Sequence, residues 1–189
     1  MVTAFTAWGY QVSYLELASV VTSLIAVLLG ALGRRIVWPW WFISSLLYSI
    51  FFWYVDLLAS AILQLVFMAA AIWGWRGWKP SGVAPRYMAN MERAFWTLGL
   101  LAAWLVTAPL LANVGAAATY PDSFLLVAST IAQILMVLQR NETWFLWLVI
   151  DAFGTFHYAR QGYWFTSVLY FIFTLIAIFG WSRWLKIRH

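Results

Sequence analysis

The sequence predicts an all-α membrane protein with seven transmembrane helices, and three observations support this fold class. Of the 189 residues, 65% are apolar and only 9% are charged, with a mean hydropathy of +0.84. Apolar blocks of roughly 18 to 22 residues recur along the whole chain, and a helix of about 20 residues crosses a bilayer core of about 30 Å. Arginine and lysine gather in alternate connections between these blocks. The chain is therefore a polytopic membrane protein.

Charged residues, glycines and prolines divide the chain into candidate spans. The predicted spans cover residues 14–33, 36–54, 57–78, 93–113, 122–139, 143–159 and 162–184. Residues 1–13 contain no Lys or Arg, so they lack the basic start of a signal peptide and are expected to form an external N-terminal segment. Residues 79–92 are expected to form a cytoplasmic loop, and residues 185–189 a cytoplasmic tail.

The basic residues predict an orientation with the N-terminus outside and the C-terminus in the cytoplasm. In that orientation ten of the eleven Lys and Arg residues face the cytoplasm, and only Arg160 lies outside. This asymmetry is what the positive-inside rule expects. The net charge of +5 is thus a topology signal. The expected partner is the lipid bilayer, and no nucleic acid partner is expected.

Several chemistries lack the residues that they need. The chain has no cysteine, and its two histidines, His157 and His189, are too far apart in the sequence to suggest a metal cluster. The polar stretch 76–93 lacks the G-x-x-x-x-G-K-[ST] spacing of a phosphate-binding loop. We therefore expect no metal and no cofactor.

The chain repeats itself at an offset of 106 residues. A shift of that length places residues 16–78 on residues 122–184 without a gap, with 16 identities over 63 positions. Apolar composition inflates chance matches, so the matched rarer residues carry the argument. These are Arg34 with Arg140, Trp38 with Trp144, Trp41 with Trp147, Gly74 with Gly180, Trp75 with Trp181 and Trp78 with Trp184.

Each repeat contains three spans, so a direct fusion would leave the two halves inverted in the membrane. The span at 93–113 carries the chain back across and makes the repeats parallel. The predicted plan is 3+1+3, with a first repeat at 14–78, a linking helix at 93–113 and a second repeat at 122–184. Repeats of this kind are typical of transporters whose substrate binds near the middle of the membrane.

Three stretches resemble a known family. They are W-x-x-W followed four positions later by a polar residue (Trp144, Trp147, Asp151), the "RQG" before the last span, and "LLASAILQLVFMAAAIWGWRGW" in the third span. On these residues the chain resembles the PnuC-type vitamin transporters, and the resemblance extends from about residue 13 to the end.

The resemblance implies a function that the periodicity does not show. Members of that family are carriers of the bacterial inner membrane with a SWEET-like 3+1+3 fold. They move nicotinamide riboside or, in sister groups, thiamine, by facilitated diffusion through one central site, and they assemble as homotrimers. The nicotinamide riboside carriers have Asn at the position of Asp151 and near that of Ser44, and both differences are compatible with the thiamine branch.

Asp151 is the principal candidate for a substrate contact. It lies eight residues into its predicted span, about 12 Å deep at 1.5 Å per residue and near the midplane. A midplane carboxylate costs about 2.5 to 3.5 kcal/mol and usually faces a bundle interior or a watery cavity. Both suspected substrates carry a fixed positive charge on a flat ring. Cation-π contacts of about 0.5 to 2 kcal/mol each and a carboxylate counter-ion suit such a ring.

The other candidate substrate contacts are aromatic or polar side chains within the spans. They are Trp147, Trp144, Gln64, Tyr170, Trp41, Ser44 and Tyr158. Weaker candidates are Ser45, Tyr48, Ser129, Thr130 and Gln133. Gln64 and Tyr170 are equivalent under the 106-residue shift, and an interhelical contact is an equally good reading of Gln64.

Six tryptophans near the predicted inner surface have an alternative interpretation. They are Trp38, Trp75, Trp78, Trp144, Trp181 and Trp184, and a belt of aromatic residues at the lipid headgroups is the expected role of all six. Trp41 and Trp147 lie one turn deeper.

Two other functions remain open at this point. A carrier for a neutral solute such as a sugar would share the architecture but would not need a buried charge. A membrane-embedded enzyme or assembly factor would need a nucleophile with a base, or metal ligands around one cavity, and Asp151 with His157 is a thin set. The sequence therefore favours a carrier for a small cationic vitamin.

Overall fold

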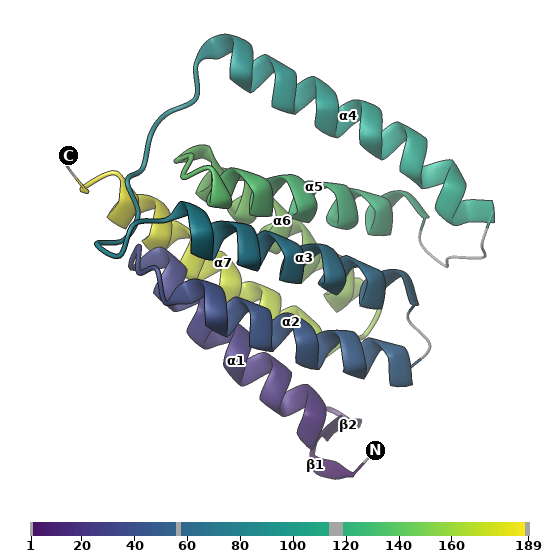
Figure 1. Ribbon diagram of the computed structural model, residues 1–189. Helices are drawn as coiled ribbons and strands as arrows, with labels where there is room; N and C mark the ends of the chain where they lie inside the picture. Colours follow the sequence, from purple (N-terminus) through teal and green to yellow (C-terminus); the bar gives the residue numbers. More distant parts are fainter. Residues whose placement is uncertain (1, 56–57, 114–118, 188–189) are drawn as a thin grey trace.

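The structure, a computed structural model, is a bundle of seven helices with a short N-terminal hairpin (Figure 1). It describes residues 2–55, 58–113 and 119–187. The helices are α1 (Tyr14–Ala31), α2 (Val37–Tyr54), α3 (Leu58–Gly77), α4 (Asn90–Asn113), α5 (Thr119–Val137), α6 (Glu142–Arg160) and α7 (Trp164–Trp184). The hairpin consists of β1 (Thr3–Ala7) and β2 (Tyr10–Ser13).

The helices confirm the predicted spans closely. Predicted and observed ends differ by at most three residues, as at α4, which starts at 90 instead of 93. Within the described residues, four helices have the length and hydropathy of a membrane span: Tyr14–Ala31, Asn90–Leu110, Tyr120–Val137 and Trp164–Trp184. The many Trp and Tyr residues of α2, and the charged residues of α6, lower the hydropathy of those two helices.

Six helices form a ring, and α4 lies outside it. In each set of three consecutive helices the middle one packs against both others: α2 against α1 and α3, and α6 against α5 and α7. The two sets join where α1 packs on α7 and α3 packs on α5. Helix α4 packs mainly on α5, and Figure 1 shows it at the edge of the bundle. The order around the ring places α2 opposite α6.

Most basic residues lie at one end of this ring, which we call the arginine-rich end. The turns after α1 and α5, the loop after α3 and the end of α7 meet there. They carry nine described basic residues: Arg34, Arg35, Arg76, Lys79, Arg86, Arg93, Arg140, Arg183 and Lys186. Arg188 lies outside the described residues. Arg160 is at the opposite end, where α6 stops.

Two tryptophans fill notches that glycines leave on neighbouring helices. The ring of Trp38 on α2 lies against Gly74 on α3, where a Cβ atom would overlap it. In the second set, Trp144 on α6 lies against Gly180 on α7, at 2.8 Å from the place of a Cβ. Trp144 follows Trp38, and Gly180 follows Gly74, by 106 residues. The glycine notch and the tryptophan that fills it therefore occur in both helix sets.

Two further tryptophans tie the helix sets to each other. Trp78, just after α3, donates its indole N–H to the Val137 carbonyl at the end of α5, at 3.2 Å. Trp184, at the end of α7, donates to the Gly30 carbonyl near the end of α1, at 3.0 Å. Each bond joins one set to the first helix of the other. The arginine-rich end of the ring is thereby closed by protein.

The headgroup-belt interpretation is wrong for four of the six tryptophans. Trp38, Trp78, Trp144 and Trp184 are at most 2% exposed and belong to one apolar cluster with Trp41. Trp75 is 40% exposed, and Trp181 is half-buried, so those two remain candidates for the belt. Glycine notches on adjacent helices receive the rings of Trp38 and Trp144, and carbonyl acceptors satisfy the buried indole N–H groups of Trp78 and Trp184.

The N-terminal segment is a β-hairpin, which the sequence analysis did not predict. Trp8 and Gly9 form its two-residue turn, and both have positive φ, as a hairpin turn of this kind requires. Tyr10 stacks on Phe165 at the start of α7, and its hydroxyl donates to both Glu16 carboxylate oxygens at 3.1 Å. Burial, and secondarily the Glu16 carboxylate, raises the pKa of Tyr10 to about 12. The hairpin is therefore anchored to the bundle by a ring contact and hydrogen bonds.

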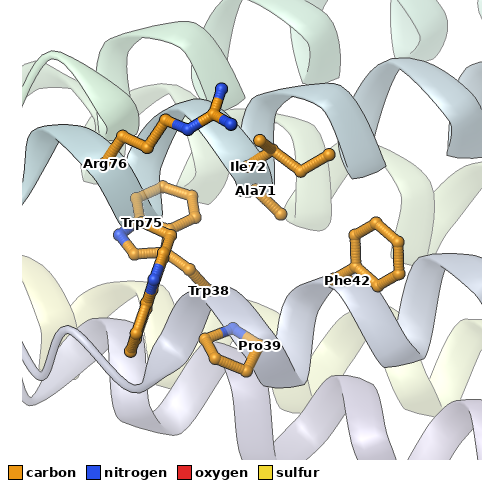
Figure 2. Close-up of a pocket in the computed structure, with 7 residues that line it drawn as sticks. All are labelled: Trp38, Pro39, Phe42, Ala71, Ile72, Trp75 and Arg76. Atoms are coloured by element: carbon orange, nitrogen blue, oxygen red, sulfur yellow. The ribbon is translucent and has the colours of Figure 1, made fainter.

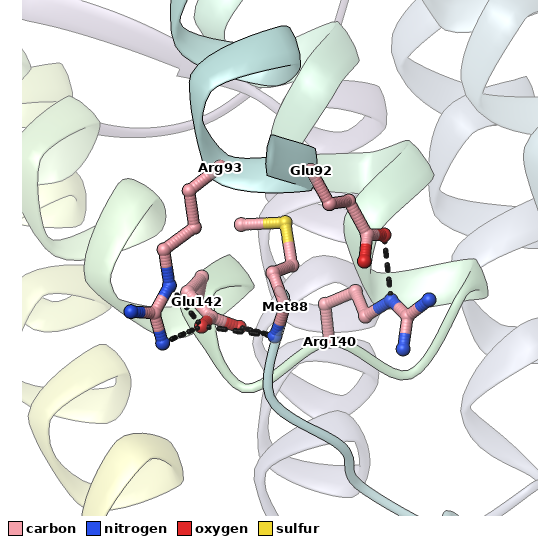
Figure 3. Close-up of polar contacts among 5 residues, drawn as sticks. All are labelled: Met88, Glu92, Arg93, Arg140 and Glu142. Atoms are coloured by element: carbon pink, nitrogen blue, oxygen red, sulfur yellow. Dashed lines mark hydrogen bonds and ion pairs between the residues drawn. The ribbon is translucent and has the colours of Figure 1, made fainter. Parts of the chain in front are cut away.

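The loop between α3 and α4 is fastened to the turn between α5 and α6 (Figure 3). The Glu142 carboxylate accepts from the Arg93 guanidinium at 2.8 Å and from the Met88 backbone N–H at 3.1 Å. Arg140 donates to Glu92 at 2.9 Å. The loop thus holds the start of α4 against the second helix set.

Replacing Glu142 by alanine is expected to lower the free energy of unfolding by about 1 to 2 kcal/mol. The change removes the charged acceptor of two donors, the Arg93 guanidinium and the partly buried Met88 backbone N–H. The Glu92→Ala control removes one partly exposed ion pair and is expected to cost less than about 1 kcal/mol. Thermal unfolding in detergent, followed by tryptophan fluorescence, measures both. Equal losses would contradict the role of the Met88 bond.

Candidate functional site

The centre of the ring is marked by two tryptophans from opposite helices. Trp41 on α2 and Trp147 on α6 have ring centroids 6.2 Å apart, and Trp41 is 8% exposed. They are equivalent under the 106-residue offset, so the two helix sets present the same residue to each other. The Trp147 indole N–H is buried and has no hydrogen-bond acceptor within the described chain. The two rings form the floor of a candidate binding site.

Asp151 lies one turn beyond Trp147 on the same helix. It is the tenth of the 19 residues of α6, so the structure confirms its position at mid-helix. Its side chain is 5% exposed. Across residues 2–55, 58–113 and 119–187 its carboxylate accepts no hydrogen bond and joins no ion pair. Burial of a carboxylate without a partner is costly, so the residue is a strong candidate for a functional role.

Two tyrosines lie beyond Asp151, towards the end of the ring opposite the arginine-rich end. Tyr170 on α7 lies against Gly154, where a Cβ atom would overlap its ring. Tyr158 contacts Tyr170 with ring centroids 5.2 Å apart. Both tyrosines and Trp147 pack against one apolar cluster of α5 and α6. The structure therefore brings three of the predicted aromatic contacts to one side of the site.

The remaining three candidates are placed differently. Trp144 is enclosed by Gly180 and by Trp184, whose ring centroid is 5.5 Å away. The Ser44 hydroxyl is buried and lies 3.4 Å from the Ser19 carbonyl of α1. Gln64 is half-buried on α3 and makes no hydrogen bond to the described residues. In this conformation the Trp144 ring packs against protein, whereas the Gln64 amide has no hydrogen-bond partner among the described residues and is available to a substrate.

Gln133 on α5 is a stronger candidate for a substrate contact than the sequence pattern indicated. Its side chain is 1% exposed, and neither its amide nitrogen nor its amide oxygen has a partner among the described residues. Gln133 has Val27 as its counterpart in the first helix set. A polar residue whose counterpart in the other repeat is apolar is a sequence feature that could have ranked Gln133 higher.

Two of the pockets in the structure lie away from the centre of the ring. One lies between α2 and α3 (Figure 2), and the other lies between the hairpin, α1 and α7. None of the eight predicted substrate contacts lines either pocket. Asp151 is 5% exposed, so a substrate can contact it only after the surrounding side chains or helices move.

The Gly154→Ala substitution is expected to weaken substrate binding by about tenfold. The added methyl group displaces the Tyr170 ring, and overpacking of this kind costs about 1 to 3 kcal/mol. Gly99→Ala in α4 is the control, because nothing lies within 4 Å of the added atom. Equilibrium binding to the purified protein measures both variants. Unchanged binding in Gly154→Ala would show that Tyr170 is remote from the substrate.

Comparison with known proteins shows which family this chain resembles. The model of a family described as nicotinamide mononucleotide transporter matches residues 13–186. The nicotinamide riboside transporter PnuC of Escherichia coli (strain K12) is 26% identical, over 95% of this chain and 88% of its own length. The riboflavin/roseoflavin transporter RibM of Streptomyces davaonensis is 27% identical, over 96% of this chain and 89% of its own.

One solved structure has the same fold. The crystal structure of the vitamin B3 transporter PnuC superposes with a TM-score of 0.78 at 21% identity, covering 92% of this chain and 81% of that one.

The matched family and the named relatives are transporters, so this chain is a membrane transporter and not an enzyme. The chain belongs to the nicotinamide mononucleotide transporter family, which includes the PnuC transporters. Its place is the bacterial inner membrane. The family resemblance noted in the sequence is thus confirmed.

Proposed function

We propose that the protein carries a small cationic vitamin, thiamine or nicotinamide riboside, across the inner membrane by facilitated diffusion. One observation supports this most: Asp151 is buried at mid-helix beside Trp147 with no partner within the described chain. A fixed cation on a flat ring would supply the missing counter-charge and would stack on the tryptophan. The family supports the vitamin class, because its named relatives are vitamin transporters.

In this proposal the protein consists of two parallel three-helix repeats that α4 links. The recurring tryptophan and glycine pairs and the matched helix contacts support it. The cluster of basic residues supports a cytoplasmic arginine-rich end, with the hairpin outside. Assembly as a homotrimer follows from the family resemblance only.

Within this framework each central residue has a defined role. Trp147 and Trp41 stack on the heteroaromatic ring, and Asp151 pairs with its positive charge. Gln64 and Gln133 hydrogen-bond to polar groups of the substrate, since their amides lack partners in the described residues. Tyr158 and Tyr170 cover the substrate from the side of the hairpin.

Movement of substrate to the cytoplasm requires the arginine-rich end to open. That end is closed by the bonds from Trp78 to Val137 and from Trp184 to Gly30, which join the two repeats. Release of these bonds would separate the repeats where they now meet. The other buried carboxylate among the described residues is Glu16, which lies in the first turn of α1 and accepts from the Tyr10 hydroxyl. Ion coupling is not part of the proposal.

A second candidate substrate is riboflavin, which the similarity to RibM favours. Its ring system is flat but uncharged, so it would use the tryptophans and amides more than Asp151. A neutral sugar has less support, because it needs neither a charge nor a pair of stacking rings.

Calorimetric titration of the detergent-purified protein with thiamine, nicotinamide riboside, riboflavin and glucose tests the proposal. Dissociation constants in the micromolar range or below for a cationic vitamin, with no heat from glucose, are expected. Binding of riboflavin alone would show that the substrate is a flavin and not a cationic vitamin. Binding of glucose alone would refute the vitamin assignment.

A further inference from the structure

A groove of about 260 Å³ lies on the outer face of α2 and α3, near the arginine-rich end (Figure 2). Six apolar residues and one cation line it: Trp38, Pro39, Phe42, Ala71, Ile72, Trp75 and Arg76. Figure 2 shows Trp38 and Trp75 at one end of the groove and Phe42 at the other. Ile72 is 45% exposed. In a membrane this groove therefore opens towards the lipid, outside the ring that holds Asp151.

Two arginines stand at the tryptophan end of the groove. Arg76 is exposed and forms no hydrogen bond or ion pair with the part of the chain that the structure describes. Arg35 lies with its Cζ 4.1 Å above the Trp75 ring and donates twice to the Trp75 carbonyl. Neither guanidinium has a carboxylate partner among the described residues. Arg93 and Arg140 at the same end are paired with glutamates.

The corresponding positions of the second helix set lack the charges and have a larger side chain in place of Pro39. Pro39 corresponds to Phe145, whose ring packs edge-on against Trp181 with centroids 5.6 Å apart. Trp181 is the counterpart of Trp75. Arg76 corresponds to Ser182, and Arg35 to the buried Asn141. The groove is thus a feature of this one site and not a general result of packing two such helices.

We propose that the groove binds one anionic phospholipid, with its phosphate beside Arg76 and Arg35 and an acyl chain along Phe42, Ala71 and Ile72. Basic sites between helices on the cytoplasmic side suit anionic headgroups, and a guanidinium bonds well to phosphate. A second copy of this chain fits less well. Among the described residues, the acidic side chains at this end are Glu92 and Glu142, and both are already paired.

Native mass spectrometry of the detergent-purified protein tests the proposal, with phosphatidylglycerol or phosphatidylcholine of identical acyl chains added. We expect one phosphatidylglycerol per chain to bind at least about fivefold more tightly than phosphatidylcholine. Arg76→Gln should remove most of this preference. Pro39→Phe, which copies the second helix set, should weaken both lipids by obstructing the groove. Arg183→Gln on exposed α7 is the matched control and should change nothing.

Three results would overturn the proposal. Equal binding of the two lipids to the wild type would mean that no headgroup site exists. Equal losses in Arg76→Gln and Arg183→Gln would mean that only the overall charge matters. Conversion of an oligomer to a monomer by Pro39→Phe, with lipid binding unchanged, would make the groove a subunit interface.

Discussion

Asp151→Ala is expected to weaken binding of the cationic vitamin by about 30-fold or more. Removing one member of a buried charge pair costs about 2 to 5 kcal/mol, because the other charge stays desolvated and unpaired. Asp151 is 5% exposed, and its carboxylate accepts no hydrogen bond and joins no ion pair within the described chain. Calorimetric titration of the variant with thiamine and with nicotinamide riboside measures the loss.

His157→Ala is the matched control on the same helix. His157 lies 3.4 Å from Asp122 and 2.7 Å from the Gln161 amide, near the C-terminal end of α6 and away from the two central tryptophans. Its loss should change binding less than about threefold, because its partners Asp122 and Gln161 lie away from Asp151 and Trp147. Asp151→Asn separates charge from shape, because it keeps a hydrogen-bond acceptor and removes the negative charge. Wild-type binding by both Asp151→Ala and His157→Ala would show that the site lies elsewhere.

Gly74→Ala is expected to cause the largest loss of stability among single-methyl additions. The new Cβ would overlap the indole of Trp38, which is fully buried. Trp78 and Trp41 pack against that ring, with centroids 5.1 and 6.3 Å away, and limit how far it can shift. Overpacking costs about 1 to 3 kcal/mol and occasionally more, out of a total of about 5 to 15 kcal/mol. Thermal unfolding in detergent measures the loss.

Two further glycines calibrate this prediction. Gly77→Ala, three residues later in the same helix, adds a methyl group to open space and should leave stability unchanged or slightly higher. Gly180→Ala meets Trp144 at 2.8 Å and should fall between the two. The opposite order, with Gly77→Ala as the most damaging change, would contradict the packing of the tryptophans into glycine notches.

The helices were predictable because bilayer thickness sets their length. Apolar blocks of about 20 residues with arginines between them left little freedom for the ends of α1 or α7. The hairpin was not predictable in the same way. Its signal is only Trp8 and Gly9 between two short alternating strands, and its stability comes from contact with Phe165, which is distant in the sequence.

The tryptophans show where sequence reasoning about a membrane protein is weakest. A tryptophan near a helix end is equally compatible with the headgroup region and with a notch on the next helix. Gly74 and Gly180 were visible as matched residues, but only the packing of α2 on α3 and of α6 on α7 shows that Trp38 and Trp144 fill them. The same limit applies to the indole bonds of Trp78 and Trp184.

The candidate site was predictable in part. The cost of a carboxylate in lipid identified Asp151, and helical spacing identified Trp147 as its neighbour. Trp41 follows from the repeat, because equivalent residues of two repeats can meet at their axis. Gln133 could be ranked only after the structure placed its amide in the interior without partners among the described residues.

Counterflow in liposomes tests the central claim most directly, namely that a cationic vitamin crosses downhill through the centre that Asp151 lines. Liposomes containing the protein are loaded with unlabelled thiamine or nicotinamide riboside, without any ion gradient, and traces of the same labelled vitamin are added outside. We expect transient accumulation of one labelled vitamin with the wild type and none with Asp151→Ala. Absence of accumulation for both vitamins, or accumulation that Asp151→Ala leaves unchanged, would contradict the account.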